Sequence, residues 1–342
     1  MANPTIGAGY PRALLDFAVS KGADRQTLLK RSGIRAEELN QQDNRVLVSR
    51  YVELIEAAAE LTNEPAIALQ FGEAVRMQEI SIVSLICEAC ETTIEVGRQL
   101  NRYAALVVDD GGEPATLMRA IWKDNGVWLE GPSEIFTNNP LIAEAEFARL
   151  VWNARVMFAG SAEFQKLKFP RIMHFMHAEP GYRAEHERVF QAPVVFGSYW
   201  NAMLIDAEFL SLKQPPVNRY VFGVLSTRAE ALLKELENSK TTRGRVESLL
   251  MPVLHTGDAN MDGIAEKLGL SRQTLYRQLK AEGVTFEQVL DELRHKLALH
   301  FLSGQKVSVN ETAYLVGFSD PAAFSRAFKR WTGKSPRAYR DT

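Results

Sequence analysis

The chain has 342 residues, of which 46% are hydrophobic, with 14 prolines, 22 glycines and a formal net charge of -2. Such a chain can bury a substantial core and is long enough for two domains. Its N-terminus shows no charged segment leading into an apolar one, no apolar run approaches the roughly 18 residues that a membrane span needs, and two cysteines cannot build a disulfide framework. We therefore expect a soluble, cytoplasmic protein without a membrane segment.

The first 210 residues mix helical and strand-like patterns. A hairpin is predicted over residues 116–131, because Asp124, Asn125 and Gly126 supply the positive φ angles of a tight turn. A strand-like run follows at 166–176. Helices are predicted over residues 11–20, 49–61, 80–107, 140–159 and 182–190. This mixture predicts an α+β domain.

The boundary of the first domain is predicted at Gln214-Pro215-Pro216, where the pattern breaks. We assign residues 1–216 to an α+β domain and residues 217–239 to a linker with a connecting helix. Residues 240–342 form the predicted second domain, which is all-helical.

An internal repeat organises this second domain. Ile264-Ala265, Leu268-Gly269 and Ser271 recur 48 residues later as Thr312-Ala313, Val316-Gly317 and Ser319. Each copy has an apolar helix, a glycine for a turn with positive φ, and a serine able to cap the next helix. Between the copies, apolar spacing predicts one continuous helix at about 285–302. The pattern therefore predicts two helix-turn-helix motifs.

Basic residues concentrate in the same region. Residues 258–342 hold 13 Lys and Arg against 10 Asp and Glu, a net charge of +3, whereas the rest of the chain carries -5. Residues 321–340 contain six basic residues and no acid, and residues 271–280 contain three and no acid. Two such helices indicate a polyanionic partner.

Residues 259–340 resemble the tandem helix-turn-helix domain of the AraC/XylS transcriptional regulators. The resemblance depends on "SRQTLYRQLK" in the first copy, on Leu293-Arg294 and Ala298 in the connecting helix, and on "AYLVGFSDPAAFSRAFKRWTGKSPRAYR" in the second. The upstream part is similar to the N-terminal ligand-binding domain of a subset of that family, at "LLDFAVSKG" and "FMHAEPGYRAEHERVFQAPVVFGSYWNAMLI". The resemblance implies a homodimeric regulator of promoter DNA, in which residues 1–216 form an effector-binding and dimerisation domain that binds a small molecule. It also implies an activator that contacts RNA polymerase rather than a repressor.

Candidate DNA-contacting residues lie on the second helix of each motif, where Arg277 and Arg326 are the strongest because Arg can bind guanine or phosphate with two hydrogen bonds. The leading positions of the second copy carry no side-chain donors, so we expect the first half-site to be read more stringently. The full candidate set is Ser271, Arg272, Gln273, Thr274, Tyr276, Arg277, Lys280, Ser319, Pro321, Ala322, Ser325, Arg326, Lys329 and Arg330.

Other signals carry less functional weight. Cys87 and Cys90 have the spacing of half a metal site but lie in an apolar helical pattern, which favours buried thiols. His174 and His177 point to opposite faces of a strand, and His186 is isolated, so we expect no metal or other cofactor. For the effector pocket the candidates are Trp122, Trp128, Phe136 and Trp152, although core packing is the stronger explanation for each of them.

Two alternative functions remain open. Motifs of hydrolases, zinc proteases and nucleotide-binding enzymes are absent from the sequence, so no catalytic residue is assigned and we expect no enzyme activity. The first alternative to an effector-controlled regulator is an enzyme-like or effector-independent first domain fused to a DNA-binding module. An architectural DNA-binding protein would leave the large acidic first domain without a role.

Overall fold

The computed structural model describes residues 3–110, 116–123, 125–131, 139–215, 219–256, 259–303 and 307–340. The chain forms two compact units, Met1–Leu233 and Lys234–Thr342. Asp124, Phe136 and Pro216, which entered the predictions above, lie outside the described residues. Among the described helices, none is both long and apolar enough to cross a membrane.

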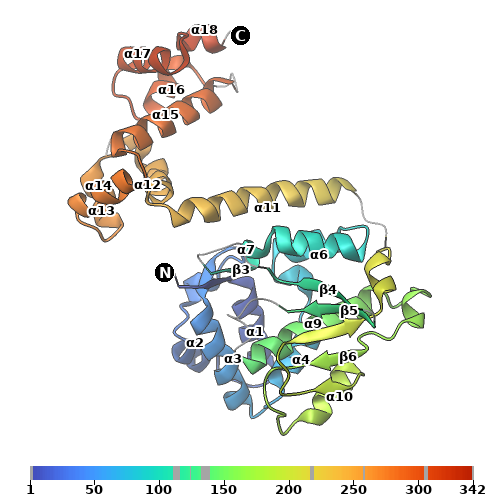
Figure 1. Ribbon diagram of the computed structural model, residues 1–342. Helices are drawn as coiled ribbons and strands as arrows, with labels where there is room; N and C mark the ends of the chain where they lie inside the picture. Colours follow the sequence, from blue (N-terminus) through green and yellow to red (C-terminus); the bar gives the residue numbers. More distant parts are fainter. Residues whose placement is uncertain are drawn as a thin grey trace. The chain divides into compact units, whose positions relative to one another are not determined.

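The first unit begins with a helical layer around a small sheet (Figure 1). Strands β1 (Thr5–Gly7), β2 (Arg45–Leu47) and β3 (Val108–Asp109) form an antiparallel sheet in the order β2-β1-β3. Seven helices pack with it into one apolar core: α1 (Gly9–Ser20), α2 (Arg25–Ser32), α3 (Val48–Thr62), α4 (Ile67–Ala74), α5 (Ile82–Glu88), α6 (Thr93–Arg102) and α7 (Ala104–Val107).

The predicted continuous helix over 80–107 is wrong, because this segment contains α5, α6 and α7. Ser81 caps α5, and the Thr92 hydroxyl accepts a hydrogen bond from the Glu95 amide to start α6. Between the two helices the backbone of Glu91 accepts a hydrogen bond from Gln214, which an uninterrupted helix would not allow. Helix α2, helix α4 and the small sheet were not predicted.

A five-stranded sheet completes the first unit, in the order β4-β5-β8-β6-β7, with only the β6–β7 pair parallel. The predicted hairpin is confirmed as β4 and β5. Helices α9 and α10 pack on the sheet (Figure 1). The elements are β4 (Arg119–Lys123), β5 (Gly126–Glu130), α9 (Pro140–Met157), β6 (Ile172–His174), α10 (Arg183–Phe190), β7 (Val194–Val195) and β8 (Ala202–Ile205).

Strand alternation gives this sheet two different faces. Val127 and Leu129 of β5 point into the core shared with α9, whereas Trp128 packs with Trp200 on the opposite face. Helix α4 lies unusually close to α9 at Gly72, because a Cβ there would be 2.5 Å from the Cβ of Ala148. Close packing at this glycine fixes the position of α9, which carries side chains of two sites described below.

Helix α11 (Arg219–Lys240) contains the predicted connecting helix, and the boundary between the two units falls within it. The second unit is all-helical, as predicted. Its elements are α12 (Thr242–Leu250), α13 (Met261–Lys267), α14 (Arg272–Ala281), α15 (Phe286–Ser303), α16 (Val309–Leu315), α17 (Pro321–Thr332) and α18 (Pro336–Arg340).

Helix α15 matches the helix predicted at 285–302 and contributes to both small cores of the second unit. Its first half packs with α12, α13 and α14, and its second half packs with α16 and α17. At 1.5 Å per residue a helix of this length spans roughly 27 Å. The fold class predicted from sequence, an α+β domain followed by tandem helix-turn-helix motifs, is confirmed.

Candidate nucleic-acid interface and ligand cavity

The first helix-turn-helix motif consists of α13 and α14. Gly269 turns the chain with φ +67, and the hydroxyl of Ser271 accepts a hydrogen bond of 3.1 Å from the Thr274 amide. Leu275 and Leu279 are fully buried, so the other side of α14 faces outward. The glycine, the cap and the apolar pair all occupy the positions that the repeat predicts.

The outer face of α14 carries the predicted DNA-contacting side chains. Thr274 is half-buried, and the others are exposed: Ser271, Arg272, Gln273, Tyr276, Arg277 and Lys280. Arg272 forms an ion pair with Asp262 at 2.5 Å, whereas Arg277 forms no ion pair within the described part of the chain. Arg277 therefore presents its full charge at this surface.

The second motif consists of α16 and α17, and its cap differs from the prediction. Asp320, not Ser319, begins α17, since its carboxylate accepts hydrogen bonds from the amides of Ala322 and Ala323 at 3.0 and 2.9 Å. Pro321 occupies the first helical position, which moves the cap one residue past the aligned serine. Ser319 stays exposed beside the helix terminus.

Helix α17 buries its aromatics and exposes its cations. Phe324 and Phe328 are fully buried, and Phe318 and Trp331 pack against the same core. On the outer side, Ala322, Arg326, Lys329 and Arg330 are exposed, and Pro321 and Ser325 are half-buried. Arg326 lies 3.9 Å from Asp320, and Arg330 pairs with Asp291 of α15 at 2.7 Å. Arg326 is therefore the more loosely held of these two arginines.

Arg294 of α15 clamps the turn of the second motif, a role that the sequence did not indicate. Its guanidinium donates hydrogen bonds of 3.1 Å to the carbonyl oxygens of Val316 and Gly317 and lies 4.8 Å from the centre of the Phe318 ring. Two carbonyl groups at the end of α16 thereby gain hydrogen-bond partners. This arginine belongs to the scaffold and not to the outer face.

The first unit contains a cavity of about 380 Å³. It lies among α1, α5, α6, β4, β5, α9 and β8, and most of its lining side chains are apolar. Such a volume is within the range of small-molecule sites. Cys87 lines this cavity as a buried free thiol, and burial raises the pKa of both Cys87 and Cys90. The prediction of two buried thiols is confirmed.

One end of the cavity is polar, and its residues were not predicted. Arg149 and Glu146 of α9 lie 3.8 Å apart, and the Arg149 guanidinium is 5.1 Å from the centre of the Tyr10 ring. Burial raises the pKa of Glu146 to about 7, an effect that the charge of Arg149 opposes. Burial likewise raises the pKa of Tyr10. The available signal was the spacing of Glu146 and Arg149, three residues apart and therefore on the same face of α9.

The predicted pocket aromatics lie in three different places. Trp122 lines the cavity and is 65% exposed, whereas Trp128 lies on the opposite face of the sheet. The pairing of Trp122 with Val127, and of Ile121 with Trp128, explains the difference, because paired residues share a face. Trp152 is 41% exposed on α9 and does not line the cavity.

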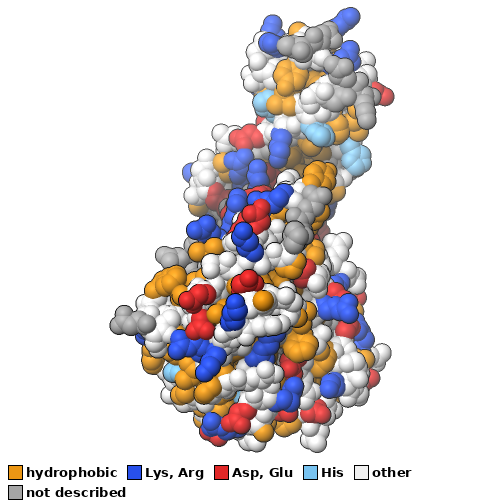
Figure 2. All heavy atoms as spheres, turned by 90° about the vertical axis from the view of Figure 1, so that its right-hand side faces the viewer, with side chains coloured by type: hydrophobic (Ala, Val, Ile, Leu, Met, Phe, Trp, Pro, Cys, Tyr) orange, Lys and Arg blue, Asp and Glu red, His pale blue; other side chains and the backbone are white. Residues whose placement is uncertain are grey.

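Surface charge alone would not have identified the interface. On the face shown in Figure 2, basic and acidic side chains are interspersed over the first unit. The two motifs are identified instead by turn glycines, caps, buried apolar pairs and exposed cations on α14 and α17. A chain with two such motifs is a helix-turn-helix DNA-binding protein.

Two family models match the chain. Residues 22–214 match the arabinose-binding domain of AraC transcription regulators, N-terminal, and residues 264–342 match a helix-turn-helix domain. Because the first match alone covers more than half of the chain, this protein belongs to the AraC family of transcription regulators. It is accordingly a DNA-binding regulator and not an enzyme.

Three known regulators are similar to the chain over different lengths. The ornithine utilization regulator of Pseudomonas aeruginosa is 26% identical over 346 residues, which cover 98% of this chain and 96% of that protein. The transcriptional regulator VirS of Mycobacterium tuberculosis is 24% identical over 333 residues, covering 95% and 93%. The transcriptional activator RhaS of Escherichia coli is 40% identical over 119 residues, 34% of this chain and 42% of that protein.

Replacing Arg277 by Ala is expected to weaken binding to operator DNA by about 1 to 3 kcal/mol and to relax specificity at one base pair, if the guanidinium holds a guanine. A contact to phosphate would instead weaken all sequences alike and lower the salt dependence. Fluorescence anisotropy with single-base operator variants at several salt concentrations separates the two. Arg245→Ala serves as the matched control, since Arg245 is an exposed arginine of α12 outside the candidate set. Equal losses in both variants would contradict the assignment.

Proposed function

We propose that this protein is a homodimeric, effector-controlled activator of transcription, which binds promoter DNA through α14 and α17 and acts in the cytoplasm. Effector control is supported by the cavity of the first unit, which lies in a domain that matches the arabinose-binding domain of AraC transcription regulators. The activator role is supported by the similarity to RhaS, which is named a transcriptional activator, and by the family resemblance, which implies contact with RNA polymerase. Exposed Tyr220, Val221 and Val224 on α11 offer an apolar surface for a second copy.

Two recognition helices in one chain imply two half-sites in successive major-groove turns, roughly 10 base pairs apart. Polar and basic side chains extend along the outer face of α14, whereas the first exposed side chain of α17 is Ala322. The first helix can therefore form hydrogen bonds with base edges from its leading turn, and the second can contact only thymine methyl groups there.

We expect substitutions in the half-site bound by α14 to cost about 1 to 3 kcal/mol each, and those facing the first turn of α17 to cost less. A base-by-base substitution series across both half-sites, measured by anisotropy, checks this. Equal penalties in the two half-sites would disprove the asymmetry.

The lining of the cavity indicates the chemistry of the effector. The matching family model is named for arabinose, but most side chains around this cavity are apolar, and sugar hydroxyls would lack partners there. Arg149 supplies one buried cation, shared with a Glu146 carboxyl whose pKa burial raises to about 7. We propose a ligand with an apolar body and one anionic end placed at Arg149.

Gly97 allows a direct test of the cavity. This residue lies on α6 between lining residues one turn away on either side, Thr93 and Asn101, and a Cβ added there meets no atom within 4 Å. Gly97→Phe should fill the cavity without disturbing the helix, so we expect it to abolish ligand binding and to leave basal DNA affinity unchanged. Gly160→Phe, at an exposed position outside the cavity, is the control.

The experiment begins with a thermal-shift screen of small apolar carboxylic acids, each paired with its methyl ester. An active acid is then tested for its effect on operator affinity, by anisotropy, and on promoter output, by in vitro transcription. Operator affinity and output that both stay flat at saturating acid would disprove the switch. Binding of the ester as tightly as the acid would disprove the role of Arg149, and an unaltered ligand Kd in Gly97→Phe would place the ligand elsewhere.

A further inference from the structure

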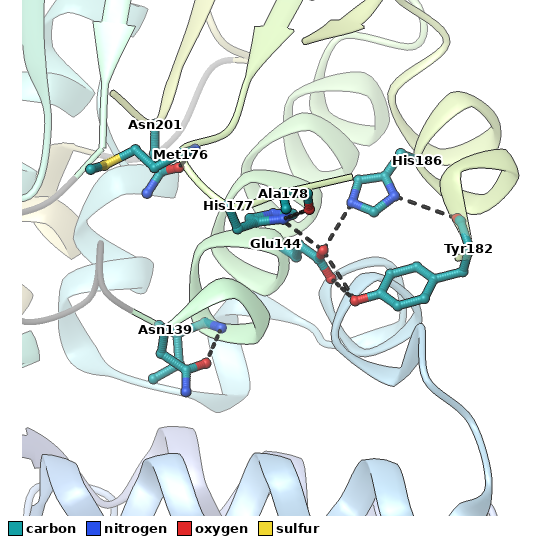
Figure 3. A network of polar contacts seen from close by, with 9 residues as sticks. Asn139, Glu144, Met176, His177, Ala178, Tyr182, His186 and Asn201 are labelled. Atoms are coloured by element: carbon teal, nitrogen blue, oxygen red, sulfur yellow. Dashed lines mark hydrogen bonds and ion pairs between the residues drawn. The ribbon is translucent and has the colours of Figure 1, made fainter. Parts of the chain in front are cut away.

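A buried cluster in the first unit joins three residues that are far apart in sequence. Glu144 lies on α9, His186 on α10, and His177 in the segment after β6 (Figure 3). The side chains of Glu144 and His186 are 0% exposed, and that of His177 is 11% exposed. Their potential ligand atoms all lie within 4.8 Å of one another. The cluster is separate from the lining of the effector cavity.

Backbone carbonyls fix the orientation of both imidazole rings. Nδ1 of His177 lies 2.9 Å from the carbonyl oxygen of Ala178, and Nδ1 of His186 lies 3.5 Å from that of Tyr182. A carbonyl oxygen only accepts hydrogen bonds, so in a neutral His177 ring Nδ1 carries the proton and the lone pair is on Nε2. The longer contact of 3.5 Å favours the same tautomer in His186, whose Nε2 lies at hydrogen-bond distance, 2.9 Å, from Oε1 of Glu144. In both histidines Nε2 faces Glu144.

Three electron-pair donors thus converge on one buried point. Nε2 of His186 lies 2.9 Å from Oε1 of Glu144, and Nε2 of His177 lies 3.4 Å from the same oxygen. The latter nitrogen is buried and has no hydrogen-bond partner in the described structure. Lone pairs that face a carboxylate repel it, unless a cation lies between them.

The surroundings of the cluster resemble the outer shell of a metal centre. The hydroxyl of Tyr182 donates hydrogen bonds to both carboxylate oxygens of Glu144, at 3.2 and 3.1 Å. Histidines that bind a metal through one nitrogen usually donate the other N–H to a carbonyl or carboxylate, and a metal-bound carboxylate is itself hydrogen-bonded. Phe175 and Phe196 pack against the two imidazoles and limit access of water.

We propose that Glu144, His177 and His186 bind a divalent transition metal, with Zn²⁺ as the best match. Two imidazoles and one carboxylate suit zinc, whereas calcium and magnesium prefer oxygen ligands alone. Zinc bonds of about 2.0 to 2.2 Å in tetrahedral geometry place neighbouring ligand atoms roughly 3.4 Å apart. The two Nε2 atoms lie 2.9 and 3.4 Å from Oε1 of Glu144, and all three ligand atoms lie within 4.8 Å of one another. The three residues leave the fourth position for water or an exogenous ligand.

The site would couple elements that the effector cavity also uses. Its ligands come from α9, α10 and the segment after β6, while Glu146, Phe147 and Arg149 of the same α9 line the cavity. A bound metal would hold α9 against α10 at Glu144, only two residues from Glu146. Sequence spacing did not reveal this cluster, because 33 and 9 residues separate its members and no short ligand motif is present.

Untagged full-length protein, freed of metal by chelation, should bind one equivalent of Zn²⁺ in competition with a chromophoric chelator. His177→Gln removes the most accessible ligand and should weaken Zn²⁺ binding by at least roughly 100-fold, beyond the effect of losing an outer-shell partner. His174→Gln is the matched control, since His174 lies three residues away and contacts Ser198 instead. Circular dichroism and operator binding confirm that each variant is folded.

Tyr182→Phe separates a metal site from an ion pair of Glu144 with protonated imidazole. With a metal, loss of the hydroxyl should weaken Zn²⁺ binding by about 10 to 100-fold. Co²⁺ should give the intense visible bands of a tetrahedral site in the wild type and lose them in His177→Gln. Absence of Zn²⁺ binding by the wild type, or the same affinity in wild type and His177→Gln, would overturn the proposal.

Discussion

Gly317→Ala is expected to destabilise the second helix-turn-helix motif by about 2 to 5 kcal/mol, which combines left-handed backbone strain with overpacking. Gly317 has φ +80, and a Cβ there would lie 2.2 Å from the backbone carbonyl oxygen of Leu254. Backbone atoms cannot move aside as a flexible side chain can. The Arg294 clamp on the same turn leaves the chain little freedom to relax.

Gly269→Ala provides the internal comparison, because it occupies the same position of the first motif. Its φ is +67, but a Cβ would meet no atom within 4 Å, so only the backbone term of about 1 to 2 kcal/mol applies. Hydrogen exchange of peptides from α16 and α17, and from α13 and α14, measures the two motifs separately in the full chain. Equal losses of protection in both variants would contradict the role assigned to Leu254.

The DNA-binding half of this fold was predictable because its determinants are local. Turn glycines, capping residues and apolar pairs at spacings of four act within a few residues. They predicted the two helix-turn-helix motifs, now α13–α14 and α16–α17, and the helix between them, α15. The one local error, Ser319 in place of Asp320 as the cap, arose because alignment of the two copies ignored the preference of proline for the first helical position.

The effector cavity was not predictable, because it forms where distant segments meet. Whether Trp122 or Trp128 faces it depends on hairpin register and on which face of the sheet α9 covers. Neither is determined by a short stretch of sequence. The polar end, Glu146 and Arg149, depends in turn on close packing of α4 against α9 at Gly72.

The half-buried Glu146 carboxyl at this polar end should make stability depend on pH. Burial raises the pKa of Glu146 from its ordinary value of 4.5 to about 7. Between these values the folded chain holds a proton that the unfolded chain has released, so the free energy of unfolding falls as pH rises from about 4.5 to about 7, and no further above that. The difference corresponds to about 2 to 3 kcal/mol.

Glu146→Gln keeps the shape of the side chain and removes its titration. Relative to the wild type, the variant should therefore gain about 2 to 3 kcal/mol of stability between pH 4.5 and pH 8. Urea unfolding at both pH values, with Glu53→Gln as a control on the exposed face of α3, measures the gain. A difference between variant and wild type that stays constant with pH would mean that Glu146 is ionised throughout. In that case the carboxylate would neutralise Arg149, and an anionic ligand would have no free cation to meet.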